Sequence, residues 1–496
     1  MNVLLIYPEC PQTFWSLTHA LRLIRKKAAA PPLGLLTVAA MLPAEWSLRL
    51  IDLNVTGLCK TDLVWADMAM VSGMIVQRES SRRAIARCKE AGLTVVAGGP
   101  LFTTEHEHFE GVDHFVLGEA EVALPAFLVD LERGCAKSVY RAEGFADMSE
   151  SPIPRWDLVD PSHYISRGVQ FSRGCPRDCD FCEVTQLFGH RWRTKTASQV
   201  ISELDTLYGL GWRGVIPFVD DNINGRPKLL RESLLPALIE WRKGRRGVSF
   251  SAQATIDLAD DEELMKMMVR AGFDTVFVGI ETVDEAGLAE CNKRQNRHRD
   301  LLADVRKIQR SGLQVQGGFI VGFDSDTPRV FEQMRSFIQS SGITTAMVGM
   351  LQAPSGTPLY KRLAQEGRIR LKVSGDNSDG TTNVIPRMGL EALQEGYRSL
   401  LRDLYSPPSY YQRMKTFLRE YRPPPTSQRL TGQHVLAFVR SLYSLALAGR
   451  EHWHYPDLLV WTLFRNPRAL PTAVALAIYG YHYRLHYERI TGGSTG

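Results

Sequence analysis

Three cysteines in one short stretch are the residues of this chain best suited to chemistry. Cys175, Cys179 and Cys182 stand at C-x3-C-x2-C spacing, while the other five of the eight cysteines are scattered. Iron–sulfur clusters take cysteine thiolates as ligands, and a cubane held by only three of them keeps one iron open to a small molecule. Arg173 and Arg177 beside the cysteines favour the thiolate form. The spacing therefore predicts an iron–sulfur centre with an open coordination position.

A zinc site is the alternative for the same loop, with His190 as a fourth ligand. Structural zinc loops usually join a Cys-x2-Cys pair to a distant second pair, and the sequence offers no such second pair. A zinc-stabilised, non-catalytic binding module thus stays open as a weaker alternative.

The elements that must position the cysteines form an α/β repeat. The loop directly follows the first of six strand-like runs, which alternate with amphipathic helical stretches. Six βα units are too few for a closed eight-stranded barrel, so we expect a partial (β/α)6 barrel with its chemistry at the C-terminal rim. The six runs are 168–172, 215–219, 248–252, 275–280, 315–321 and 344–350.

The first part of the chain predicts a separate doubly wound, Rossmann-like α/β domain. Five short apolar runs alternate there with helical stretches, at 3–7, 48–53, 68–72, 94–97 and 114–117. The first run resembles a buried strand more than a signal peptide, so secretion is not expected. Ligands of such sheets bind beyond the carboxyl ends of the strands. The residues expected there include Ser72, Gly73, Gly98, Gly99, Pro100 and Glu119.

The last part of the chain is aromatic and basic. Residues 390–496 hold 11 of the 16 tyrosines, and 13 Lys and Arg against 7 Asp and Glu. We expect helices here, in none of which an apolar stretch reaches the ~20 residues that span a bilayer. Such helices suit either the surface of a membrane or packing against the barrel. Together with a proline-containing linker near residue 150, this predicts three domains, 1–150, 151–385 and 386–496.

The cysteine spacing, with Phe181 before the last cysteine, resembles the radical S-adenosylmethionine (SAM) superfamily. The resemblance implies that Cys175, Cys179 and Cys182 hold a 4Fe–4S cluster whose open iron binds SAM. It also implies an external reductant such as flavodoxin or ferredoxin. We assign no catalytic acid or base, because radical chemistry resides in the cofactors.

Later segments are similar to the SAM-binding segments of that superfamily in their order along the chain. The glutamate that often closes the fifth-strand segment is absent, and Asp324 and Asp326 lie nearby instead. The residues that the resemblance places near SAM are Phe181, Asp220, Asp221, Asn222, Gln253, Glu281, Gly318 and Ile320.

The first domain then resembles the cobalamin-binding domain of cobalamin-dependent radical SAM enzymes. Its glycine loops, 72–74 and 98–100, match the loops that embrace the corrin, and Glu119 follows the fifth strand. The loop that supplies a histidine to cobalt in many cobalamin folds is missing. The resemblance therefore implies no histidine ligand on cobalt, and His19 is the residue that would contradict this expectation.

Nearly the whole chain is similar to the subgroup that contains hopanoid C-2 methylases and bacteriochlorophyll side-chain methyltransferases, including segments 191–196, 346–360 and 410–413. This implies methylation of an unactivated carbon in a large apolar lipid or pigment. A radical SAM enzyme without cobalamin, catalysing a rearrangement or C–C coupling, is the alternative. We expect a cytoplasmic monomer with no nucleic-acid partner, and peripheral contact with the inner face of the cytoplasmic membrane as an option.

Overall fold

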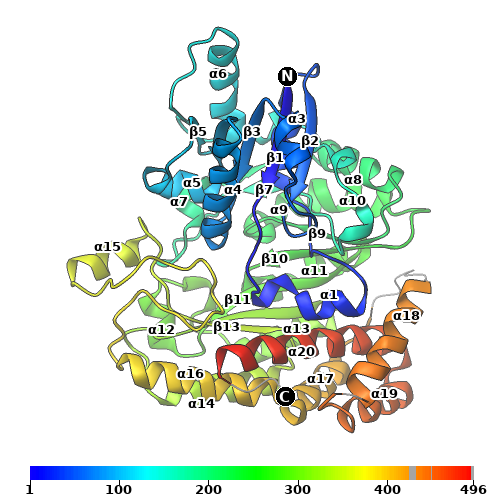
Figure 1. Ribbon diagram of the computed structural model, residues 1–496. Helices are drawn as coiled ribbons and strands as arrows, with labels where there is room; N and C mark the ends of the chain where they lie inside the picture. Colours follow the sequence, from blue (N-terminus) through cyan, green and yellow to red (C-terminus); the bar gives the residue numbers. More distant parts are fainter. Residues whose placement is uncertain (424–431, 448, 493–496) are drawn as a thin grey trace. The chain divides into compact units, whose positions relative to one another are not determined.

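The computed structural model describes residues 1–423, 432–447 and 449–492, and the chain forms two compact units (Figure 1). The first unit comprises residues 1–11, 27–176 and 184–212, and the second comprises residues 12–26, 177–183 and 213–496. Each unit is built on its own parallel sheet.

The first unit contains a six-stranded, entirely parallel sheet in the order β2-β1-β3-β4-β5-β6. All five predicted strands are present, and a short sixth strand extends the sheet beyond β5. The strands are β1 (Asn2–Tyr7), β2 (Ser47–Asp52), β3 (Met68–Ser72), β4 (Thr94–Gly98), β5 (His114–Leu117) and β6 (Val139–Arg141). The helices that accompany them are α2 (Leu33–Ala39), α3 (Lys60–Trp65), α4 (Arg78–Glu90), α5 (Pro100–Glu105) and α6 (Ala120–Glu132).

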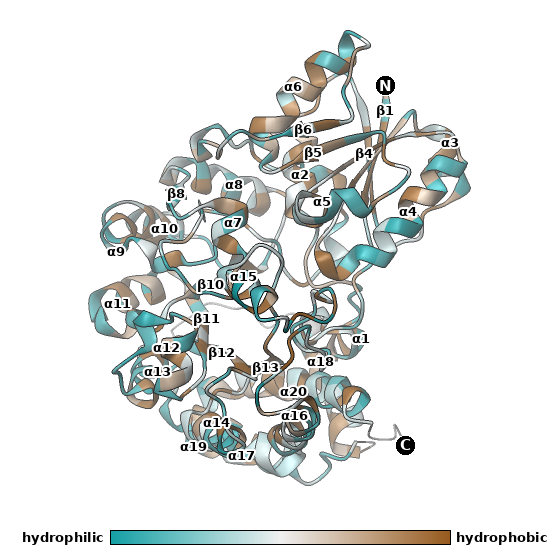
Figure 2. Cartoon of the chain, turned by 90° about the vertical axis from the view of Figure 1, so that its left-hand side faces the viewer, coloured by the Kyte–Doolittle hydropathy of each residue, from teal (hydrophilic) through white to brown (hydrophobic). Residues whose placement is uncertain are grey.

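Both faces of this sheet are buried, as expected when crossover helices cover a parallel sheet. Successive side chains of a strand point to opposite faces. Leu4 and Ile6 of β1 accordingly pack into one apolar cluster, while Val3 and Leu5 pack into another. Figure 2 shows strands of this sheet in brown, the colour of apolar residues. The doubly wound architecture predicted from the apolar runs is thus confirmed.

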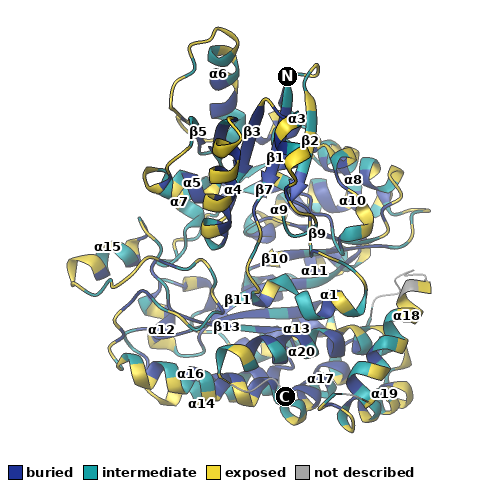
Figure 3. Cartoon of the chain, in the orientation of Figure 1, coloured by how far each residue is buried: buried dark blue, intermediate teal, exposed yellow. Residues whose placement is uncertain are grey.

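The second unit contains a five-stranded parallel sheet in the order β13-β12-β11-β10-β9. Its strands are β9 (Gly214–Phe218), β10 (Val248–Ala254), β11 (Phe273–Glu281), β12 (Gln314–Val321) and β13 (Ala346–Met350). Figure 3 shows much of this sheet in dark blue, the colour of buried residues. The helices between and after the strands are α9 (Pro227–Leu229), α10 (Leu235–Trp241), α11 (Glu262–Ala271), α12 (Glu285–Glu290), α13 (Leu301–Arg310), α14 (Arg329–Ser341) and α15 (Pro358–Gln365).

One of the six strands predicted for this sheet pairs elsewhere. The run 168–172 contributes only its last residue to β7 (Ser172–Arg173), which belongs to the first unit and pairs antiparallel with β8 (Arg193–Thr194). The nearby β8 gives β7 a local partner for its backbone groups. The first unit also holds α7 (Val184–Phe188) and α8 (Ala197–Gly209).

The C-terminal region is helical, as predicted. It consists of α16 (Leu390–Tyr405), α17 (Pro407–Glu420), α18 (Gly432–Ser441) with a π-helical turn (Leu442–Leu447), α19 (His454–Arg465) and α20 (Leu470–Ile490). Two of its tyrosines join it to the sheet, because Tyr397 and Tyr405 donate hydrogen bonds to carbonyls of the edge strand β13, at 3.0 and 2.6 Å. Across the described residues, no helix combines the length and apolar character needed to cross a bilayer.

A segment from the start of the chain joins these C-terminal helices. Residues 12–26, which include α1 (Thr18–Leu23), belong to the second unit. The Phe14 ring stacks on Tyr483 of α20 at a centroid distance of 4.1 Å, and the Phe14 carbonyl contacts His482 Nε2 at 3.0 Å. The backbone N–H of His19 donates to His482 Nδ1 at 3.4 Å. The second unit is therefore assembled from both ends of the sequence.

Candidate functional site

The stretch that carries the three cysteines passes from the first unit into the second at residue 177. On the first-unit side, Gly174 has a φ of +86°, and a Cβ there would lie 2.5 Å from the carbonyl oxygen of Arg191. Only glycine fits this turn. The N–H of Cys175 donates to the carbonyl of Gly189 at 3.2 Å, which fixes the start of the cysteine loop.

On the second-unit side, backbone contacts hold the rest of the loop. The N–H of Asp180 donates to the carbonyl of Cys291 (3.2 Å), and Asn292 Nδ2 donates to the carbonyl of Asp178 (2.8 Å). The N–H of Cys182 donates to the carbonyl of Cys179 (3.1 Å). The segment after α12 therefore clamps the loop that carries Cys179 and Cys182.

The donor set suits a multi-iron cluster. Cys175, Cys179 and Cys182 form no disulfide and are all partly exposed. Among the residues that the structure describes, no three His, Cys, Asp or Glu side chains are grouped so that they could hold one metal ion. A cubane cluster does not need the three sulfur atoms to lie around a single ion, because each thiolate binds a different iron. His190, the alternative zinc ligand, is exposed.

Apart from Phe181 in the cysteine loop, the predicted SAM residues lie on or just after strands β9 to β12, with different degrees of burial. Asp220 and Asn222, beyond β9, are buried, Asp221 is partly exposed, and Gln253 on β10 is exposed. Phe181 and Ile320 pack against one apolar cluster that contains Cys291. Gly318 on β12 is buried, and a Cβ there would lie 2.8 Å from the ring of Phe277.

Glu281 has a partner that sequence reasoning missed. Lys293 Nζ donates to Glu281 Oε1 at 2.7 Å, and both side chains are 10% exposed. Gly279 makes room for the pair, since a Cβ there would lie 2.3 Å from Glu281 Oε1 and 2.9 Å from Lys293 Nζ. Glu281 also has a φ of +64°, and strained non-glycine backbone of this kind clusters at ligand sites.

Lys293 is a cation facing two of the cysteines. Burial alone would lower the pKa of Lys293, but Glu281 and the thiolates of Cys179 and Cys182 raise it above its ordinary value. The arginines expected to favour the thiolates are instead paired with carboxylates, Arg177 with Asp257 and Arg173 with Glu119 and Glu121. Nothing in the polar run Asn292–Gln295 signals that its lysine is buried.

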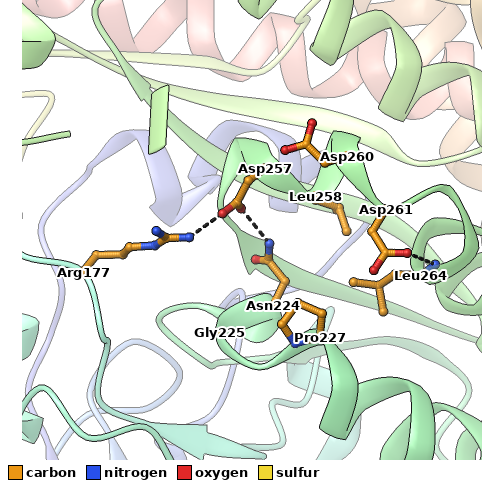
Figure 4. A pocket seen from close by; sticks show the side chains of 9 residues that line it. All are labelled: Arg177, Asn224, Gly225, Pro227, Asp257, Leu258, Asp260, Asp261 and Leu264. Atoms are coloured by element: carbon orange, nitrogen blue, oxygen red, sulfur yellow. Dashed lines mark hydrogen bonds and ion pairs between the residues drawn. The ribbon is translucent and has the colours of Figure 1, made fainter. Parts of the chain in front are cut away.

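Arg177 anchors the cysteine loop to the segment after β10. Besides Arg177, Asp257 binds Asn224 Nδ2 at 3.0 Å and Thr255 Oγ1 at 2.5 Å. Arg177, Asn224 and Asp257 line a cavity of about 410 Å³ (Figure 4). The Arg177–Asp257 pair therefore restrains the loop between the first two cysteines, and the other two contacts hold Asp257 in place.

The two other carboxylates of this cavity are also paired. Asp260 forms an ion pair with Arg299 at 2.7 Å, and Asp261 forms one with Arg231. The charges that line the cavity are thus balanced within the protein.

Two carboxylates, Asp324 and Asp326, lie in the loop after β12. They stand near the position where the resembling segment of radical SAM enzymes often has a glutamate. Asp326 accepts hydrogen bonds from the N–H groups of Gly322 (2.7 Å) and Phe323 (3.1 Å). Burial raises the pKa of Asp326 to about 6. Although burial also acts on Asp324, Arg368 and Arg362 lower the pKa of that carboxyl to about 2. The loop therefore carries one firmly ionised carboxylate and one that titrates near neutrality.

In the first unit, the structure brings the loops after β3 and β4 together. Gly99 has a φ of +90°, and a Cβ there would lie 2.5 Å from Ser72 Oγ. The N–H of Leu101, next to Pro100, donates to the carbonyl of Gly73 at 3.1 Å. A Cβ on Gly98 would lie 2.7 Å from the carbonyl oxygen of Val116. This close approach of uncharged backbone defines a glycine cradle at the ends of β3 and β4.

Glu119, also predicted to contact cobalamin, is engaged within the protein. Its side chain is 2% exposed, and its oxygens accept from Arg193 Nη2 (2.5 Å), Arg193 Nη1 (2.9 Å) and the N–H of Ala146 (2.9 Å). Arg173 Nη1 lies 3.3 Å away. In this structure Glu119 ties β5 to the segments around Ala146 and Arg193.

Two known protein families match two different parts of the chain. The B12 binding domain matches residues 22–128, and the Radical SAM superfamily matches residues 169–338. A domain of unknown function, DUF4070, matches residues 357–494. The first two matches contradict both alternatives considered from the sequence, the cobalamin-free radical enzyme and the zinc-stabilised binding module.

Three relatives extend over most of the chain. A methyltransferase of Synechocystis sp., described as uncharacterized, is 41% identical and covers 100% of this chain and 94% of its own length. Hopanoid C-2 methylase of Rhodopseudomonas palustris is 36% identical over 77% of this chain and 73% of its own. Bacteriochlorophyllide d C-12(1)-methyltransferase of Chlorobaculum tepidum is 25% identical over 78% of this chain and 85% of its own.

Solved structures share the fold. The cobalamin-dependent SAM radical enzyme OxsB, with aqua-cobalamin and SAM bound, has a TM-score of 0.61 at 14% identity and covers 99% of this chain and 79% of its own. The radical SAM methyltransferase TsrM from Kitasatospora setae has a TM-score of 0.59 at 15% identity and covers 95% of this chain and 98% of its own. The chain belongs to the cobalamin-dependent radical SAM methyltransferases, and its cofactors are a 4Fe–4S cluster, SAM and cobalamin.

Proposed function

We propose that this methyltransferase adds a methyl group to an unactivated carbon of a large apolar substrate, a hopanoid-type lipid or a tetrapyrrole pigment. The observation that carries the proposal is the 36% identity to hopanoid C-2 methylase over 77% of the chain. The weaker similarity to bacteriochlorophyllide d C-12(1)-methyltransferase supports the pigment as the second substrate class.

We propose the following division of roles. Cys175, Cys179 and Cys182 hold the cluster. The SAM residues are Phe181, Asp220, Asp221, Asn222, Gln253, Glu281, Gly318 and Ile320. Ser72, Gly73, Gly98, Gly99 and Pro100 hold cobalamin, with Glu119 as support for their unit. The domain boundaries at residues 150 and 385 remain part of the same proposal.

When bound, the cofactors supply the radical that removes a substrate hydrogen and the methyl group that replaces it. The chain's own residues then have to bind, orient and exclude water. Lys293 keeps a positive charge beside Cys179 and Cys182 and holds Glu281 in one position. Arg177 restrains the cysteine loop through Asp257. As in other radical SAM enzymes, a separate reductant delivers the electron.

The test is anaerobic reconstitution of the full chain with iron, sulfide and cobalamin, followed by incubation with lipid and pigment extracts and SAM that carries a deuterated methyl group. We expect one labelled methyl on a terpenoid lipid or a tetrapyrrole, detected by mass spectrometry. A Cys182→Ala variant is the matched control. Labelling of a polar metabolite alone, or labelling that persists in the control, would contradict the proposal.

A further inference from the structure

Large apolar residues are exposed along α18, the π-helical turn after it, and α19. Figure 3 shows parts of α18 and α19 in yellow, the colour of exposed residues. Phe464 is 81% exposed, Trp453 78% and Leu447 77%. Exposed apolar patches of this kind mark sites of interaction with another surface. The full set consists of Val435, Leu436, Val439, Tyr443, Leu447, Trp453, Val460, Leu463 and Phe464.

The exposed side chains form stripes. Val435, Val439, Tyr443 and Leu447 recur at every fourth position, and Val460 and Phe464 do the same on α19. Residues four apart lie on one face of a helix. The inner faces are already occupied, since Leu445, Tyr455 and Leu458 are buried. The exposed apolar residues therefore do not take part in the packing of these helices against the rest of the C-terminal region.

The charges around the stripes are positive. Arg465 and Arg468 are exposed, and Arg440 is partly exposed. Arg450 is also exposed but pairs with Glu488 at 3.2 Å. The only acidic residues of the segment 432–470 are Glu451 and Asp457.

Both of these carboxylates are neutralised. Glu451 is buried and accepts from Arg484 Nε at 2.7 Å. Asp457 is paired with Lys415 at 2.5 Å. In the part of 432–470 that the structure describes, no carboxylate lacks a cation. The surface thus combines exposed apolar groups with an excess of arginine.

We infer that the outer face of α18, the π-helical turn and α19 docks this enzyme on an anionic phospholipid bilayer. Trp, Tyr and Phe rings suit the headgroup boundary, and arginines attract anionic lipid. The helices lie in the boundary and do not cross the membrane, in line with their length and composition. The inference goes beyond the proposed function and stands without it, because docking needs no turnover.

The test uses the full chain with its cofactors and vesicles floated on a density gradient. One set contains phosphatidylcholine with 30 mol% phosphatidylglycerol, at roughly the anionic content that attracts polybasic segments, and the other contains phosphatidylcholine alone. We expect binding to the anionic vesicles that weakens with salt, and little binding to neutral ones.

Two double variants separate the contributions. Trp453→Ser with Phe464→Ser should weaken partitioning at least tenfold, because each ring loses its burial in the boundary. Arg465→Gln with Arg468→Gln should weaken it about tenfold to thirtyfold, on anionic vesicles only. The matched control is Val64→Ser with Leu371→Ser, which removes side chains that are 86% and 69% exposed elsewhere, and it should bind like the wild type.

Equal vesicle binding of the wild type and the Trp453/Phe464 variant would overturn the inference. So would a concentration-dependent dimer in light scattering that the same variant abolishes, because the surface would then be a subunit interface. Iron content and 5′-deoxyadenosine formation should be unchanged in all variants, which shows that they are folded. Methylation of a detergent-dispersed substrate is measured separately, so failure of docking and failure of the proposed function can be told apart.

Discussion

The loops at the strand ends of the first unit differ in character from those of the second. In the first unit, Gly99 packs so closely on Ser72 that a Cβ at position 99 would lie only 2.5 Å from Ser72 Oγ. In the second unit, Glu281 and Lys293 form a buried ion pair beside two cysteines. The first set of loops is built of closely packed, uncharged backbone, and the second carries a buried pair of charges.

The difference fits two kinds of ligand. A macrocycle as large as cobalamin needs a close backbone surface, which glycine provides because it has no side chain. SAM and an iron–sulfur cluster bear charges, and a buried charge must be paired or bonded. We therefore expect each site to depend on the feature that distinguishes it.

The largest effect is expected from Cys179→Ala. Removal of one of three proposed cluster ligands should abolish SAM cleavage and sharply lower bound iron, while cobalamin binding by the first unit persists. Iron analysis, 5′-deoxyadenosine formation and the visible spectrum of bound cobalamin report the three quantities. Cys291→Ala, at a buried thiol whose pKa burial raises to about 12, is the matched control and should keep its iron. Full iron and full turnover in Cys179→Ala would remove the basis of the proposed site.

Lys293→Met should have the next largest effect, because it leaves the Glu281 carboxylate buried without its cation. Breaking a buried pair in this way costs about 3–5 kcal/mol. We expect loss of SAM binding in calorimetry and a shift of the cluster's midpoint potential in a redox titration. Lys293→Arg, which keeps the charge, should retain part of the binding. Wild-type behaviour of Lys293→Met in both measurements would show that the charge of Lys293 supports neither SAM binding nor the cluster.

Gly99→Ala should damage the first unit selectively. A Cβ would collide with Ser72 Oγ, and a φ of +90° is itself unfavourable for alanine, by about 1–2 kcal/mol. Cobalamin affinity should fall at least tenfold while iron content stays the same. Gly134→Ala is the control, because Gly134 has a φ of +69° but nothing within 4 Å of its Cβ position. Equal losses in both variants would mean that backbone strain, and not the cradle, is responsible.

The smallest effect concerns pH and Asp326. Burial raises its pKa from 3.8 to about 6, so the folded protein binds this proton more tightly than the unfolded chain. Its contribution to stability is therefore greatest below pH 4 and is lost as pH rises through 6, by about 2–3 kcal/mol. Asp326→Asn keeps an acceptor for the N–H groups of Gly322 and Phe323 but cannot ionise.

The measurement for Asp326 is calorimetry at pH 5 and pH 7.5. The melting temperature of Asp326→Asn relative to the wild type should be higher at pH 7.5 than at pH 5. A difference between variant and wild type that does not change with pH would show that Asp326 carries no such proton. Gly99→Ala should give a difference that is independent of pH, since no ionisable group lies in that contact.

Much of the fold could be predicted because the strands of both sheets are short apolar runs, such as 3–7 and 315–321. A run buried on both faces leaves a clear trace in the sequence. The strand at 168–172 was overestimated because its hydrogen-bonding partner, Arg193–Thr194, is only two residues long and polar.

The site was only partly predictable for a related reason. Cysteine spacing and strand-end glycines are local patterns, and they can be recognised. The pairing of Glu281 with Lys293 depends on how the segment after α12 folds back toward β11, which no local pattern encodes. Likewise, the ion pairs of Glu119 with Arg193 join residues 74 positions apart. Long-range electrostatic partners become visible only in three dimensions.

The placement of residues 12–26 has a consequence for biosynthesis. Phe14 leaves the ribosome well before α20 is translated, yet its ring stacks on Tyr483 of that helix. The nascent first unit can close its sheet early, whereas the second unit is complete only after α20 has been synthesised. We expect a chain that stalls before α20 to expose Phe14 and become a target for chaperones.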